Sequence, residues 1–309
     1  MRRALLLSLV LVLVATGAGA CDSSSDTDTE RDLSPAVLAP YEGLGTWVDV
    51  FDYVPEFQAP GQPPAVTPES LDDMAELGVR TLYLQAAQAD ERSPEDTVDA
   101  QLLGQFLRRA HRSGIAVVAW YLPRFDDVDA DLRRIRAVRE FRAGNDSFDG
   151  LALDIEWTQG VPDVAARNDA LLDLAGRVRD LVGDDEAVAA IVLEPVLLEV
   201  VNPLYWPDFP WQRVRPHFDV WMPMSYWTNR EAASGYRDGF AYTEENVHRL
   251  RRNLDDDDAV VHPIGGIGDG ATAADYEGFV RASREVDAVG WSVYDFVTSS
   301  SSAWPRLRG

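Results

Sequence analysis

Short apolar segments and charged amphipathic segments alternate along most of the chain. Eight apolar runs, rich in Val, Ile, Leu and aromatic residues, recur at intervals of roughly 35 residues. Strands that are buried on both faces, as in a parallel sheet, have such nearly continuous apolar sequences. We therefore expect eight buried strands, within residues 46–53, 79–86, 115–122, 150–157, 187–195, 219–227, 259–267 and 288–296.

The segments between these runs have the residue order of amphipathic helices with recognisable ends. In the first of them, Thr67 is a preferred N-terminal cap, Pro68 suits the first turn, and Gly78 suits the residue after the last turn. Five further segments repeat apolar residues at helical spacing, with Asp and Arg on the opposite face. They cover residues 102–110, 132–141, 164–182, 244–254 and 272–285.

Strands that alternate with helices build βα units and a parallel sheet. Eight such units over about 265 residues fit the size of a (β/α)8 TIM barrel, which is the fold we predict. The alternative is an open doubly wound sheet. That fold usually has a glycine-rich phosphate loop after its first strand, whereas residues 48–57 contain no glycine.

The N-terminus has the three-part order of a secretory signal: a basic start, an apolar stretch over residues 4–14, and small residues up to Ala20. The only cysteine, Cys21, follows directly. Residues 1–20 thus resemble the signal peptide of a bacterial lipoprotein, with Ala18 where Leu is usual. The resemblance implies that Cys21 is lipidated; the alternative is a cleaved secretory signal with an incidental cysteine.

Residues 21–40 are polar and acidic and end in proline. Such a segment cannot bury enough apolar surface to fold. We therefore expect a disordered tether over residues 21–40 and a folded domain over residues 41–309. Together with the signal peptide, this organisation predicts an extracytoplasmic domain that a lipid anchor holds at the membrane.

The composition excludes several classes of function. The chain has 28 basic residues, all arginine, against 52 acidic residues; the net charge of −24 repels a phosphate backbone, so we expect no nucleic-acid partner. A single cysteine excludes a disulfide framework and a multi-cysteine zinc site. The four histidines are scattered, and residues 255–258 lack the spacing of a calcium loop, so we expect no metal and no cofactor.

Polar side chains follow the predicted strands, at the ends where the active site of a TIM barrel lies. The charged ones are nearly all acidic, with aromatic residues beside them. This combination suits glycoside chemistry, because acids protonate or stabilise the sugar and flat rings stack on its faces. The candidate substrate-binding residues are Asp49, Trp120, Glu194, Trp227, Tyr294 and Asp295.

Two of the strand-end residues have simpler alternative roles. Glu194 precedes Pro195 and either contributes to the site or pairs with an arginine. His262 follows two valines, and a buried, hydrogen-bonded histidine is the more common case at such a position.

The fourth strand ends in Asp154-Ile155-Glu156. Alternate residues of a strand share a face, so the two carboxylates point the same way at the strand end. Like charges that are close and partly buried raise one pKa, and a carboxyl group that stays protonated near neutral pH is a competent general acid. The alternative is that the pair caps a helix or bridges to arginine.

Residues 148–157 resemble the fourth-strand motif of family 18 glycoside hydrolases, DGxDxDxE. Asp149, Gly150, Asp154 and Glu156 match, while Ala152 stands where the family has Asp. The resemblance implies that Glu156 is the general acid. It also implies that Asp154 orients the acetamido group of the substrate, which serves as internal nucleophile.

Two later segments extend this resemblance. Met224 and Tyr226 match the MxYD motif of the sixth strand, with Trp227 in place of Asp. The last strand, GWSVYDF, has Tyr294 where a tryptophan is usual. The resemblance implies that Tyr226 hydrogen-bonds the same acetamido group. The chain is similar to a divergent branch of the glycosidase barrels.

A weaker resemblance is to family 25 lysozymes, which have an Asp on the first strand and Asp-x-Glu on the fourth. Asp49 would then join Asp154 and Glu156. The largest clan of retaining barrels places a nucleophilic Glu on the seventh strand. Residues 260–269 contain no Glu, which disfavours that mechanism.

The connection over residues 200–219 is long and rich in proline and aromatic residues. It is either a wall on which sugars stack or a lid packed on its own aromatic rings. For the whole chain, we expect a glycoside hydrolase with a carbohydrate substrate. The alternatives are a non-catalytic carbohydrate-binding lipoprotein and another barrel chemistry, such as metal-assisted hydrolysis or deacetylation.

Overall fold

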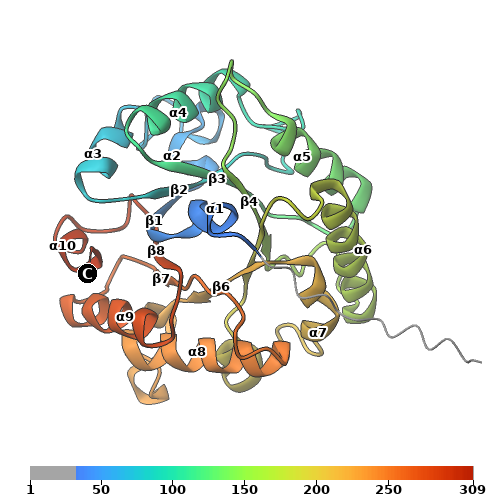
Figure 1. Cartoon of the computed structure of the whole chain (residues 1–309), viewed down its shortest axis with the longest axis vertical. Coiled ribbons are helices and arrows are strands. Elements are labelled where there is room, and N and C mark those ends of the chain that lie inside the picture. Colours follow the sequence, from blue (N-terminus) through green and yellow to red (C-terminus); the bar gives the residue numbers. More distant parts are fainter. Residues whose placement is uncertain (1–32, 309) are drawn as a thin grey trace, which may run out of the picture. The chain divides into compact units, whose positions relative to one another are not determined.

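The computed structural model describes residues 33–308 and confirms the (β/α)8 TIM barrel (Figure 1). Eight parallel strands pair in sequence order, and β8 pairs with β1 to close the barrel. Near-continuous apolar runs form these strands because both faces are buried. The strands are β1 Gly43–Val48, β2 Thr81–Gln85, β3 Ala116–Tyr121, β4 Gly150–Ile155, β5 Val188–Val192, β6 Val220–Ser225, β7 Ile264–Gly266 and β8 Gly290–Tyr294.

Helices surround the barrel (Figure 1). Aspartate side chains accept a backbone N–H at the first turns of α4, α5, α6 and α8, so part of the acidic composition caps helices. The longer helices are α3 Ser70–Glu76, α4 Ala100–Arg112, α5 Val128–Glu140, α6 Val164–Val182, α8 Gly239–Leu254 and α9 Ala273–Glu285. The short ones are α1 Pro35–Leu38, α2 Val50–Tyr53, α7 Trp211–Val214 and α10 Trp304–Leu307.

Short 3-10 and π turns complete the connections. They are η1 Ala39–Tyr41, η2 Pro55–Phe57, η3 Leu197–Val201, η4 Arg215–His217, η5 Trp227–Asn229 and η6 Ala232–Ser234. No helix among residues 33–308 is long and apolar enough to cross a membrane.

Two elements differ from the sequence-based expectation. The helix expected from Thr67 begins at Ser70, because a turn in which the Ser70 N–H donates to the Thr67 carbonyl precedes it (2.9 Å). The strand expected over residues 259–267 is reduced to β7, because Pro263 has no N–H to donate to the sheet.

The segment before β1 closes the N-terminal end of the barrel. The Tyr41 hydroxyl lies 3.0 Å from the carbonyl oxygens of Leu151 and Ala187, and the Tyr41 carbonyl lies 2.7 Å from Nδ1 of His262. Residues 35–41 are helical, so the expectation that the tether is disordered up to residue 40 is wrong. The rest of the tether, the signal peptide and Cys21 lie outside the described residues.

His262 is fully buried, and burial lowers its pKa to about 4. The neutral ring therefore serves packing and hydrogen bonding at the N-terminal end, as the simpler alternative held.

Aromatic rings fill the barrel interior below the C-terminal ends of the strands. Trp47 stacks on Tyr83 with ring centroids 4.3 Å apart, and its Nε1 donates to Ser292 Oγ (2.8 Å). Gly45 makes room for this pair, since a Cβ there would lie 2.6 Å from Tyr83 Cε2. The packed rings form the floor of the barrel mouth.

Candidate functional site

A cavity of about 260 Å³ opens among residues at the C-terminal ends of the strands. It contains six of the nine candidate catalytic and substrate-binding residues named from the sequence. Its lining is Trp47, Asp49, Phe51, Gln85, Gln88, Trp120, Leu122, Asp154, Glu156, Ile191, Met224, Tyr226, Ile264 and Tyr294.

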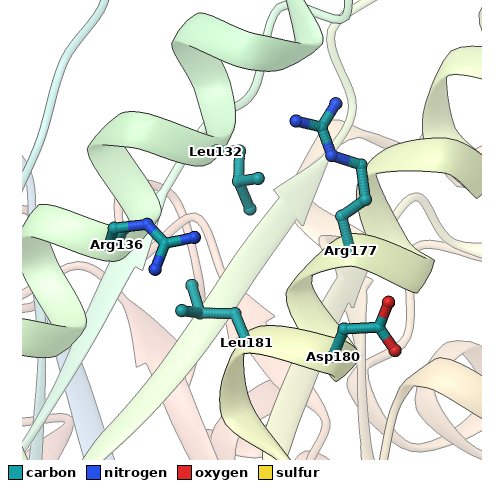
Figure 2. Close-up of a pocket in the computed structure, with 5 residues that line it drawn as sticks. All are labelled: Leu132, Arg136, Arg177, Asp180 and Leu181. Carbon is teal, nitrogen blue, oxygen red and sulfur yellow. The ribbon is translucent and has the colours of Figure 1, made fainter.

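A second hollow, of about 550 Å³, lies between helices α5 and α6 (Figure 2). Its lining is Leu132, Arg136, Arg177, Asp180 and Leu181. Arg177 is already paired with Asp129 (2.6 Å) on the helix surface. Because no strand-end residue lines this hollow, the cavity at the mouth is the candidate site.

The pair Asp154 and Glu156 lies in the mouth cavity at the end of β4. Asp154 is only 8% exposed, and its Oδ1 has no hydrogen-bond partner among the described residues. Burial and the charge of Glu156 raise the pKa of Asp154 well above its usual value, and burial raises the pKa of Glu156. The pair therefore binds a proton more tightly than two exposed carboxylates would.

Tyr226 follows β6 and lines the cavity near this pair. Burial raises the pKa of its phenol, and the charges of Glu156 and Asp154 raise it further. The phenol is therefore a neutral hydrogen-bond donor at physiological pH.

Asp49 and Tyr294 lie on the side of the cavity formed by β1 and β8. The Tyr294 hydroxyl donates to Asp49 Oδ2 (2.8 Å), and the Phe51 N–H donates to Asp49 Oδ1 (2.8 Å), which caps α2. Burial raises the pKa of Asp49 and outweighs these hydrogen bonds, which lower it. The closure of the barrel by β8 against β1 brings the two residues together.

Asp49 belongs to a cluster with Asp52 and Asp295, defined by one oxygen of each within 4.8 Å of the others. In the described part of the chain, no arginine or histidine forms an ion pair with these three carboxylates. Burial and the charges of Asp49 and Asp295 raise the pKa of Asp52 to about 7. The cluster is the one arrangement within residues 33–308 whose acidic oxygens approach closely enough to hold a metal ion.

Trp120 and two glutamines complete the polar part of the lining. Trp120 is 5% exposed, and its Nε1 has no partner among the described residues. Gln85 Nε2 donates to Gln88 Oε1 (3.1 Å), and Gln85 Oε1 accepts the Val50 N–H (3.1 Å). Gln88 was not identified from the sequence, because it lies three residues beyond β2 and outside the apolar run.

Trp227 corrects the prediction that it binds substrate. It is fully buried and packs against Phe279 (centroids 5.3 Å apart) and Tyr276 (6.2 Å) of α9. The reason is local: Met224 and Tyr226 line the cavity, so the next residue, Trp227, lies on the opposite side, toward α9.

Glu194 does not line the cavity, and the structure favours its alternative role. The carboxylate is 2% exposed and accepts hydrogen bonds from Tyr242 Oη (3.0 Å) and Arg230 (3.2 Å). Burial raises its pKa to about 6 despite the arginine. Asp295 also stays outside the lining, within the acidic cluster.

The aromatic connection between β5 and β6 packs on α6 and on its own aromatic rings. Trp206 is buried; its Nε1 donates to Asn168 Oδ1 (2.7 Å), and the Arg167 guanidinium lies 4.4 Å from its ring centroid. Phe209 packs edge-on against Trp206 at 5.3 Å. Only Tyr205 of this group is exposed, so the packed-lid alternative holds for the segment.

Solved structures with this fold include several glycosidases. The chain aligns with a family 18 chitinase from Cycas revoluta at TM-score 0.59 and 10% identity, covering 86% of this chain and 98% of the chitinase. For a chitinase from Bacteroides thetaiotaomicron, the TM-score is 0.58 at 11% identity, with 86% and 93% covered. For an endo-1,4-β-D-mannanase from Thermotoga petrophila, it is 0.56 at 10% identity, with 82% and 88% covered.

Comparison of the sequence alone adds no relative. No protein-family model matches the chain, and no curated protein matches it. At 10–11% identity, the likeness to these solved structures shows a shared TIM barrel fold.

Proposed function

We propose that this protein is a glycoside hydrolase that acts on a polysaccharide or cell-envelope glycan, with Glu156 as general acid. The observation that carries the proposal is the pair of Asp154 and Glu156, both with raised pKa values, in a cavity lined by aromatic rings. Glycoside hydrolysis needs a carboxyl group that is protonated near neutral pH beside the bond that breaks. The solved structures that share the fold include chitinases and a mannanase.

Six of the lining residues have a place in this chemistry. Glu156 is the more exposed acid of the pair and donates its proton to the leaving glycosidic oxygen. Asp154 lies deeper and, together with the neutral phenol of Tyr226, hydrogen-bonds the neighbouring substituent of the sugar. Trp47, Trp120 and Tyr294 supply ring faces and edges for the sugar.

Turnover of defined oligosaccharides tests the proposal. A panel of amino-sugar oligomers, mannan and glucan oligomers and cell-wall glycan is incubated with the wild type and with Glu156→Gln. We expect a substrate that the wild type cleaves, and a loss of about 10²- to 10⁴-fold in kcat for the variant. Asp180→Asn, in the hollow between α5 and α6, is the matched control and keeps wild-type turnover. Equal activity of wild type and Glu156→Gln, or no cleavage across the panel, contradicts the proposal.

A second candidate function is carbohydrate binding without catalysis, and Ala152 favours it. Residues 152 and 154 share a face of β4, so a carboxylate at 152 would lie next to Asp154. With alanine there, Asp154 Oδ1 is left without a partner among the residues described. This alternative predicts glycan binding by the wild type with no product, and binding that survives Glu156→Gln.

We further propose that Cys21 carries a lipid and that the domain works outside the cytoplasm. The support is the sequence of residues 1–21, with a basic start, a short apolar stretch and a lone cysteine. Expression in a bacterial host followed by membrane fractionation tests it. The wild type is expected in the membrane fraction, and Cys21→Ala in the soluble fraction; the same fractionation for both contradicts the anchor.

A further inference from the structure

The charge of the mouth cavity is one-sided. Three carboxylates, Asp49, Asp154 and Glu156, line it, and the remaining lining residues are amides, aromatic rings and apolar side chains. No arginine or histidine contributes to the lining. A saccharide with a carboxylate or sulfate group would meet like charge in a partly dehydrated space, which is unfavourable.

Carboxyl groups are most crowded on the side of Asp49. Asp52 and Asp295 approach it, with one oxygen of each residue within 4.8 Å of the others. Asp295 is 6% exposed, and the three lack a cationic partner among residues 33–308. Uncompensated carboxylates of this kind cost free energy in the empty site, and a bound cation recovers it.

Independent evidence for a ligand comes from the other side of the same cavity. Asp154 Oδ1 and Trp120 Nε1 belong to side chains that are more than nine-tenths buried, and neither atom has a partner among the described residues. Buried polar atoms are nearly always hydrogen-bonded in folded proteins. One acceptor and one donor that line a cavity without partners indicate a polar ligand that satisfies both.

The neighbours of Asp49 favour an organic ammonium over a metal ion. Both Asp49 oxygens already accept hydrogen bonds, from Phe51 N–H and Tyr294 Oη. Hard metal cations require six or more oxygen ligands, whereas the cavity beside Asp49 offers the rings of Trp47, Phe51 and Tyr294. Ammonium groups bind well where a carboxylate and aromatic faces meet.

We propose that the Asp49 side of the cavity binds a protonated amine of the saccharide, so that the preferred substrate class is a chain containing free, non-acetylated amino sugars. The inference rests on the proposed function for the saccharide itself. It adds the charge of the substrate, with Asp49 as the contact and with Asp52 and Asp295 reinforcing its negative potential.

Binding to a non-hydrolysing variant tests the inference separately from catalysis. Calorimetry at near-neutral pH and low salt compares β-1,4-linked glucosamine oligomers with N-acetylated oligomers of the same length, both added to Glu156→Gln. We expect the free-amine oligomer to bind about tenfold or more tightly. Adding Asp49→Asn removes this preference, because it weakens binding of the free-amine oligomer more than binding of the acetylated oligomer. Asn is an equally good helix cap, so the fold of α2 is kept.

Two further arms keep the result decisive. Adding Asp180→Asn instead of Asp49→Asn leaves the preference intact, because Asp180 lies between α5 and α6. If Asp49→Asn fails to fold, Asp52→Asn replaces it, because Asp52 lies outside the lining. We expect this variant also to weaken the preference for the free-amine oligomer.

Equal affinity for the two oligomers, or a preference that survives Asp49→Asn, overturns the inference. Tight binding of Ca²⁺ or Mg²⁺ alone that blocks the glucosamine oligomer also overturns it, because it assigns the cluster to a metal. If the free-amine oligomer binds more tightly but the wild type cleaves no oligomer, the proposed function is contradicted and this inference stands. If the wild type cleaves both oligomers and binds them equally well, this inference is contradicted and the proposed function stands.

Discussion

Aspartate side chains lie at both ends of the barrel, and their partners differ between the two ends. At the N-terminal end, Asp149 accepts a hydrogen bond from His111 Nε2 (3.0 Å), and Asp219 pairs with the nearly buried Arg179. Each of these aspartates also accepts a backbone N–H. Fully partnered carboxylates of this kind tie the strands together.

At the mouth, Asp49, Asp52, Asp154 and Asp295 have no cationic partner in the part of the chain that the structure describes. Strand β4 shows the contrast within one motif, because Asp149 immediately precedes it and Asp154 lies near its end. The difference indicates that carboxylates at the N-terminal end add stability, while those at the mouth cost stability and are available to a ligand.

The largest expected effect on stability is at the N-terminal end. Arg179→Met leaves the carboxylate of Asp219 buried without its charge partner, so we expect the free energy of unfolding to fall by about 3–5 kcal/mol. Urea denaturation measures it. Arg177→Met on the same helix is the matched control, because the ion pairs of Arg177 are exposed. We expect its unfolding free energy to fall by no more than about 1 kcal/mol. Equal losses of unfolding free energy in the two variants would contradict the expected difference between a buried and an exposed ion pair.

The opposite effect is expected at the mouth. Asp154→Asn removes a buried carboxylate that has no charge partner, so we expect unfolding free energy to stay constant or rise by about 1–2 kcal/mol while turnover is lost. Asp149→Asn is the control at the other end and lowers unfolding free energy by about 1–3 kcal/mol, because charge-assisted hydrogen bonds are lost. A similar loss in both variants would contradict the comparison.

Asp52 gives the comparison a pH dependence. Its folded pKa of about 7 lies above the ordinary value of 3.8, so the folded state binds the proton more tightly than the unfolded state. Unfolding free energy is therefore expected to fall as the pH rises from about 4 to about 7. In Asp52→Asn, the unfolding free energy measured by urea denaturation should depend less on pH between about 4 and about 7. If the unfolding free energy of the variant keeps the pH dependence of the wild type, other groups cause the effect.

A smaller pH effect is expected from His111. Partial burial lowers its pKa, but Asp146 and Asp149 outweigh burial and raise it above the ordinary 6.5. The stabilisation is present below about pH 6.5 and is lost as the pH rises through the folded pKa. Comparing the unfolding free energy at about pH 6 and about pH 8 in wild type and His111→Gln checks this, and an equal difference in both proteins would contradict it.

The fold was predictable because eight buried parallel strands give eight apolar runs that recur at regular intervals in the sequence. The pair of Asp154 and Glu156 was predictable for a similar reason, since strand alternation decides which side chains share a face. The same alternation places Trp227 opposite Tyr226, which lines the cavity, so the prediction that both residues face the substrate was wrong.

Long-range pairing is the other part that the sequence could not provide. Glu194 is neutralised by Arg230 and bonded to Tyr242, both on later elements. The cluster of Asp49, Asp52 and Asp295 forms only because the last strand closes against the first. Neither spacing nor composition encodes these contacts locally.

The protonation of the mouth carboxylates is the most direct test of the difference between the two ends. Infrared spectroscopy at about pH 7 distinguishes a protonated carboxyl group from a carboxylate by its C=O stretch. We expect a protonated signal that is smaller in Asp154→Asn or Glu156→Gln than in the wild type and is unchanged in Asp149→Asn. Asp52, whose pKa is about 7, contributes the part of the signal that remains in these variants. A wild-type spectrum with no protonated carboxyl group at this pH would contradict the conclusion that the mouth pair holds a proton for acid catalysis.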